Sequence, residues 1–129
     1  MEMFERDVWP KIIHIAKKKV ETGEPIETID RKNKNWVMKV EDNVITVRSE
    51  KNEINRPNGS PRPVPKWAIK EVWTILQKDG KMSRPDMLRQ VDVDKYRRIG
   101  SVIRGILALL PNVSVKKIGR HSTLFYNAL

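Results

Sequence analysis

The sequence predicts an α+β protein, in which an N-terminal helix and a three-stranded antiparallel meander precede several short helices and a β-hairpin. Three observations lead to this fold class. Apolar residues recur at helical spacing over residues 7–20, 66–78 and 95–110. Short β-rich runs lie between the first two of these stretches, and two more such runs end the chain. With 39% hydrophobic residues and four Trp among 129 residues, the chain can bury a core.

The first helix is expected over residues 7–20. Asp7 can cap its N-terminus, and Pro10 falls in the first turn, where a missing N–H costs no hydrogen bond. The apolar positions follow the three- and four-residue spacing of one helix face, and they are Phe4, Val8, Trp9, Ile12, Ile13, Ile15, Ala16 and Val20.

The meander is expected from three runs rich in β-branched residues, at 26–29, 36–40 and 44–48. Short polar segments separate these runs, and connections of this length join antiparallel neighbours. Together with the helix, the strands form the expected first unit, residues 1–48.

A linker is expected over residues 49–65. This segment contains four prolines and the turn signal Asn58-Gly59, and its large aliphatic residues are limited to Ile54 and Val64. We therefore place a domain boundary here, with a second domain at 66–129.

The second domain begins with two expected helices. Residues 66–78 have one apolar stripe and lie between Pro65 and Gly80, a residue type that commonly ends helices. Ser83 then starts a capping-box-like sequence, which predicts a second helix at 84–90.

A longer basic helix and a hairpin follow. Asp94 can cap a helix at 95–110, whose apolar stripe stops before a proline. The runs 113–118 and 123–126 are expected to form a β-hairpin around a tip that carries Arg and His.

Positive charge is concentrated in the second half of the chain. The protein has 26 Lys and Arg against 16 Asp and Glu, a net charge of +10. Residues 1–64 contain 13 basic and 11 acidic side chains, whereas residues 65–129 contain 13 basic and 5 acidic ones, and none of the acidic residues follows Asp94. A polyanionic partner is expected. Nucleic acid is favoured over an anionic membrane, because the basic stretch lacks the apolar insertion face of an interfacial helix.

The composition disfavours most enzyme classes and metal sites. The chain has no Cys, and its two histidines, His14 and His121, are far apart in the sequence. The spacing of Asp30-Arg31-Lys32 is faintly similar to the metal-binding edge of a restriction-type nuclease, but a small meander lacks the further carboxylate and the larger sheet that such chemistry needs. We therefore expect no enzymatic activity, no cofactor and no bound metal.

The sequence contains no membrane or export signal. No apolar run approaches the length of a membrane span, and the first residues have neither the basic nor the apolar region of a signal peptide. We expect a soluble, cytoplasmic protein, associated with the nucleoid if the host is a prokaryote.

The second half has the element order helix, turn, helix, turn, basic helix and β-hairpin. The segments Met82 to Leu88, Lys95 to Leu110 and Val113 to Tyr126 carry this order, and they resemble the winged helix-turn-helix DNA-binding domain. The resemblance covers half the chain and implies that helix 95–110 lies in a groove of DNA, while the hairpin, or wing, contacts the backbone or the minor groove. Winged helices also serve as protein-interaction modules, which leaves the alternative of an adaptor for an acidic protein or structured RNA.

The predicted DNA contacts lie on helix 95–110 and on the wing. At 100° per residue, Arg97, Ser101 and Arg104 fall on one face, away from the apolar stripe, and Gly105 is small enough to let a surface approach. Arginine can bond guanine bidentately or clamp a phosphate, and the hydroxyl of Tyr96 can donate to a phosphate. The predicted contacts are Lys95, Tyr96, Arg97, Arg98, Ser101, Arg104, Lys116, Lys117, Arg120 and His121.

The expected function is binding of double-stranded DNA. The protein would be a small regulator or chromatin-type factor, or the targeting domain of a larger DNA-processing protein. The first half is expected to form a homodimer or to make a second DNA contact. Dimerisation is favoured because an exposed β-edge and an apolar helix leave surface to bury.

Overall fold

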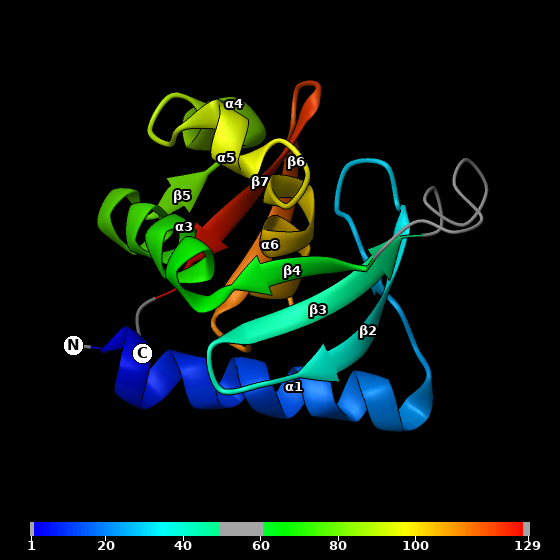
Figure 1. Cartoon of the computed structure of the whole chain (residues 1–129). Coiled ribbons are helices and arrows are strands. Elements are labelled where there is room, and N and C mark those ends of the chain that lie inside the picture. The colour runs from blue at the N-terminus through cyan, green and yellow to red at the C-terminus, as the bar shows by residue number, and fades with distance from the viewer. Residues whose placement is uncertain (1, 50–60, 128–129) are drawn as a thin grey trace.

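The computed structural model describes residues 2–49 and 61–127, which form an α+β fold (Figure 1). Its first part contains the π-helical turn η1 (Phe4–Val8), helix α1 (Trp9–Thr22) and strands β1 (Ile26–Glu27), β2 (Lys34–Val40), β3 (Val44–Ser49) and β4 (Arg62–Pro65). Its second part contains α3 (Lys66–Asp79), β5 (Lys81–Met82), α4 (Arg84–Leu88), α5 (Val93–Tyr96), α6 (Gly100–Leu107), β6 (Val113–Ile118) and β7 (His121–Tyr126). Among the described residues, no helix has the length and apolar character that a membrane span requires.

The sheet of the first part has four antiparallel strands in the order β1-β2-β3-β4, so the expectation of a three-stranded meander is wrong. Strand β4 pairs with β3 from Val44 opposite Pro65 to Val47 opposite Arg62. The last residues of the expected linker therefore belong to the sheet, and Ser49 belongs to β3. Two prolines are tolerated in β4 because it is an edge strand, where an N–H can be absent without breaking a second ladder. Residues 50–60 of that linker lie outside the described part.

Helix α1 confirms the expected N-terminal helix and packs against this sheet (Figure 1). It ends at Gly23, whose φ of 74° is left-handed and whose N–H donates to the carbonyl oxygen of Lys19. Ile12 is completely buried, and the indole N–H of Trp9 donates to the carbonyl oxygen of Asp42 at 3.1 Å, which attaches the helix to the β2–β3 turn.

The second part confirms the helices expected near 66–78 and 84–90. Helix α3 ends at Gly80 with a φ of 79°, and α4 begins with a reciprocal capping box between Ser83 and Asp86. The hairpin β6–β7 is also present, with register from Val113 opposite Tyr126 to Ile118 opposite His121. The two-residue strand β5 was not expected, and it pairs with β7 to complete a sheet in the order β5-β7-β6.

The expected helix 95–110 is wrong in one respect, because it is divided into α5 and α6. Asp92 caps α5 before the expected start, and the N–H of Ile99 donates to the carbonyl oxygen of Tyr96 in a tight turn between the helices. This break turns both Tyr96 and Ile99 into the core, where they are 2% and 8% exposed. The apolar spacing continues through the break, which is why the sequence pattern reads as one helix.

The two parts of the chain are in direct contact and share one hydrophobic cluster. They pack closely at Gly105 of α6, where an added Cβ would lie 2.9 Å from the carbonyl oxygen of Glu27 and 3.3 Å from the side chain of Ile26. The absence of a side chain at position 105 therefore allows strand β1 to pack directly against α6. The proposed division into two domains stays a prediction.

We expect Gly105→Ala to lower the free energy of unfolding by about 1–3 kcal/mol, because the new methyl group would push α6 away from the backbone of β1. Gly100→Ala is the matched control, since its Cβ would meet mainly the flexible end of Met87 at 3.0 Å. The control should change stability by less than about 1 kcal/mol. Urea unfolding followed by circular dichroism measures both, and equal effects of the two substitutions would contradict close α6–β1 packing.

Candidate functional site

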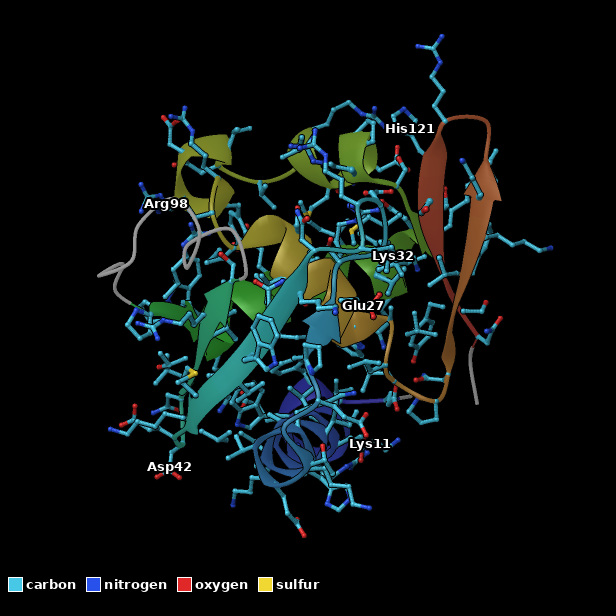
Figure 2. All side chains as sticks on the ribbon, turned by 90° about the vertical axis from the view of Figure 1, so that its right-hand side faces the viewer. Lys11, Glu27, Lys32, Asp42, Arg98 and His121 are labelled. Carbon is cyan, nitrogen blue, oxygen red and sulfur yellow. The ribbon has the colours of Figure 1, made fainter. Side chains whose placement is uncertain are left out.

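A groove of about 960 Å³ opens where the two parts of the chain meet. One wall is the turn at residues 28–33, between β1 and β2, called here the 28–33 turn. The other walls come from the starts of α4 and α6 and from the hairpin β6–β7. Figure 2 shows Lys32 of the turn near the middle of the view, between Arg98 and His121, with Lys11 of α1 below it.

The lining of this groove is strongly basic. Three of its basic residues come from the first part of the chain, and they are Arg31, Lys32 and Arg62. Six come from the second part, and they are Arg84, Arg97, Arg98, Arg104, Lys117 and Arg120. Asp30 is the one acidic residue among the described residues that line it, and no Phe, Trp or Tyr is among them. The site can therefore attract anions, and His121 supplies the one aromatic ring among its described lining residues.

Arg104 is buried, and the prediction that it points away from the core is wrong. Its side chain is 1% exposed, with Nη1 donating to Oδ2 of Asp30 at 2.7 Å and Nη2 donating to the carbonyl oxygen of Ser122 at 2.9 Å. The face of α6 that carries Arg104 is polar, as the helical pattern indicates. However, the first part of the chain covers the second turn of that face, so the guanidinium serves an internal ion pair instead of a ligand.

Asp30 connects three segments through this ion pair. It accepts from Arg104 of α6, and its Oδ1 also accepts from the backbone N–H of Ser122 in β7 at 3.3 Å. Burial disfavours the ionised carboxyl, but the hydrogen bond and charge of Arg104, together with Ser122, outweigh burial and lower the pKa of Asp30 below 3.8. Asp30 is therefore an anion at neutral pH, fixed between α6 and the hairpin.

Tyr96 is also buried, so the prediction that its hydroxyl donates to a bound phosphate is wrong. The break between α5 and α6 turns the ring inward, where it lies edge-on to Trp67 with the ring centroids 6.0 Å apart. Burial, together with the carboxylate of Glu71, raises the pKa of Tyr96.

The other predicted contacts are exposed or partly exposed, and most of them line the groove. Those in the groove are Arg97, Arg98, Ser101, Lys117, Arg120 and His121. Lys95 and Lys116 are exposed outside it. Arg97 pairs with Asp94 at 3.1 Å, but both side chains are largely exposed, so water weakens this pair and leaves Arg97 accessible to another anion.

Four lining cations were not predicted, namely Arg31, Lys32, Arg62 and Arg84. The first two lie in a polar segment that the sequence assigns to a turn between strands. Arg62 lies in the expected linker, and Arg84 starts a short helix. Their basic character is visible in the sequence, but their position opposite the hairpin depends on contacts between residues far apart in the chain, such as Asp30 with Arg104.

Comparison with known proteins gives no further assignment. No protein-family model, curated protein or solved structure matches the chain. Within residues 2–49 and 61–127, there is also no group of three or more His, Asp or Glu side chains that could hold a metal ion.

Asp30→Asn would leave the buried guanidinium of Arg104 without its counter-charge. We expect the free energy of unfolding at pH 7 to fall by about 1–3 kcal/mol, less than for a fully buried pair because the Asp30 side chain is 33% exposed. Asp94→Asn is the control, since it removes an exposed partner of Arg97 and should cost less than about 0.5 kcal/mol. Urea unfolding measures both.

The effect of Asp30→Asn should also depend on pH. The pKa of Asp30 is lower in the folded protein than the usual 3.8, so its contribution is complete above 3.8 and is lost as the pH falls through the folded-state pKa. The difference in stability between parent and Asp30→Asn should therefore shrink in acid. A difference that stays constant well below pH 3.8 would contradict the ion pair.

Proposed function

We propose that the protein binds double-stranded DNA through the basic groove and the hairpin β6–β7, chiefly by contacts with backbone phosphates. The observation that carries this proposal is the gathering of nine basic side chains and one carboxylate around a single groove. The carboxylate is already engaged by Arg104. A polyanion would supply the counter-charges that the protein itself does not place there.

The free cations of the groove support contact with phosphates. Within the described part of the chain, no carboxylate pairs with Arg84, Arg98, Lys117 or Arg120, and all four are exposed. Arg97 has only the exposed pair with Asp94. Because guanidinium groups suit phosphate oxygens and a hairpin can follow a nucleic-acid backbone, this set fits a phosphodiester chain.

The arrangement of elements is consistent with the winged helix-turn-helix resemblance. The order that carried it is present as α3, α4, the pair α5 and α6, and the hairpin, and the hairpin would be the wing. The mode of binding must differ from insertion of an exposed helix. Within α6, Ser101 is exposed and the other seven residues are buried, so the helix can present mainly its first turn to a ligand.

This geometry favours a duplex bound by its backbone. Single strands are commonly held by stacking bases on several aromatic side chains, and the described lining offers the ring of His121 alone. Base-specific contacts from α6 are limited because Arg104 is engaged inside the protein. We therefore propose binding with little dependence on base sequence, in line with a chromatin-type factor or the targeting domain of a DNA-processing protein.

Duplex affinity should depend steeply on salt. About four to six phosphate contacts imply a slope of log K against log salt near −4 to −5, from about −0.9 per contact. Fluorescence anisotropy with a labelled duplex over a salt series measures this slope, with single-stranded DNA, duplex RNA and an acidic peptide as competitors. Affinity that does not respond to salt would overturn the proposal, and preference for the RNA or the peptide would favour an adaptor.

Ser101→Glu should weaken duplex binding about tenfold or more, because it places a carboxylate at the exposed first turn of α6, against the bound phosphates. Thr74→Glu is the matched control, since Thr74 is exposed on α3, outside the hairpin, and does not line the groove. The same anisotropy titration, with circular dichroism to check the fold, compares the two variants. Equal affinities for both would place the DNA elsewhere on the surface.

A further inference from the structure

The 28–33 turn has a defined conformation that places its charges in the groove. The N–H of Thr28 donates to the carbonyl oxygen of Asn33 at 2.9 Å, and the N–H of Lys32 donates to the carbonyl oxygen of Thr28 at 3.0 Å. The Thr28 hydroxyl also accepts from the N–H of Asn33 at 3.0 Å. The turn is therefore closed by its own backbone.

The same turn is fixed to the second part of the chain. Asp30, at its centre, accepts from Arg104 of α6 at 2.7 Å and from the N–H of Ser122 in β7 at 3.3 Å. Since Arg104 is 1% exposed, this connection is shielded from water on the α6 side. The turn thus holds a set position relative to both α6 and the hairpin.

Arg31 and Lys32 directly follow this anchor and have no acidic partner among the described residues. Both are exposed and line the groove, and neither pairs with a carboxylate in the described part of the chain. Their neighbour Asp30 cannot neutralise them, because Arg104 already engages it. Two uncompensated cations therefore face the groove from the first part of the chain.

The backbone of Lys32 supports a functional role for its charge. Its φ is 56°, in the left-handed region, where a lysine is less stable than Gly or Asn. A turn selected for stability alone would favour one of those residues. A lysine at this position therefore costs backbone energy, which agrees with a use for its ammonium group.

We propose that Arg31 and Lys32 form a second phosphate-binding wall, opposite the cations of the turn between α5 and α6 and of the hairpin. The first part of the chain would then contact nucleic acid directly, in preference to serving as a dimerisation module alone. The phosphodiester backbone lies between the 28–33 turn on one side and Arg98 and Lys117 on the other. This inference rests on the proposed function, because it assigns further residues to the same groove.

The test compares two double variants of the full chain with equal loss of charge. Arg31→Ala with Lys32→Asn removes both cations of the turn, and Asn suits the left-handed backbone at position 32. Lys17→Ala with Lys18→Ala is the matched control, because these lysines are exposed on α1 and do not line the groove. Anisotropy titrations with a labelled 20-base-pair duplex, over a salt series, give the affinity and the salt slope.

The turn variant should lose about tenfold or more in affinity at moderate salt, and its salt slope should be smaller by about 2, from about 0.9 per lost contact. The α1 control should keep the slope of the parent within about 0.5. The turn variant itself should unfold at about the same urea concentration as the parent, so that weaker binding cannot be attributed to a weaker fold.

The possible failures of this test are distinguishable. If the parent binds duplex and the turn variant keeps its slope, or if the α1 control loses as much, the second wall is wrong while the proposed function stands. If the parent itself does not bind duplex, the proposed function fails and the second wall fails with it.

Discussion

The ion pair between Arg104 and Asp30 determines the form of the groove. A guanidinium that is 1% exposed requires hydrogen-bond partners, and the two that it has belong to the 28–33 turn and to β7. These partners are 74 and 18 residues away in the sequence. The two hydrogen bonds of this buried charge thus connect the three segments that form much of the groove. Without this pair, the turn would have no charged anchor against α6.

The packing at Gly105 also holds the first part of the chain against α6. Glycine permits β1 to approach α6 closely. Arg104, the residue before it, forms its ion pair with Asp30 in the turn that follows β1. Together these contacts enclose the second turn of α6 and leave Ser101 exposed at the first turn. The face of α6 that the helical pattern predicts to be free therefore lies at the base of the groove. Most of the exposed polar side chains of the groove come from the segments around α6.

Much of the fold follows from local signals in the sequence. The capping box at Ser83 and the left-handed glycine after α3 were recognisable from residue types alone, and so was the hairpin. The short strands β4 and β5 were not, because each depends on pairing with a distant partner. Arg104 was misplaced for a similar reason. A helical projection separates polar from apolar faces, but it contains no information about which polar face another segment of the same chain will cover.

Some basic residues outside the groove have acidic partners. On the α1 and α3 side, Lys66 and Lys70 pair with Glu5, and Lys11 pairs with Glu2, although Lys17 and Lys18 of α1 have no acidic partner in the described part of the chain. Around the groove, the described Arg31 and Arg98 have none, although mutual repulsion among nearby cations disfavours the folded state. A chain that can pair its charges elsewhere gains nothing in stability by leaving these unpaired. With the proposed function, a phosphate chain would relieve this repulsion along the groove, because it would supply an anion at each nucleotide.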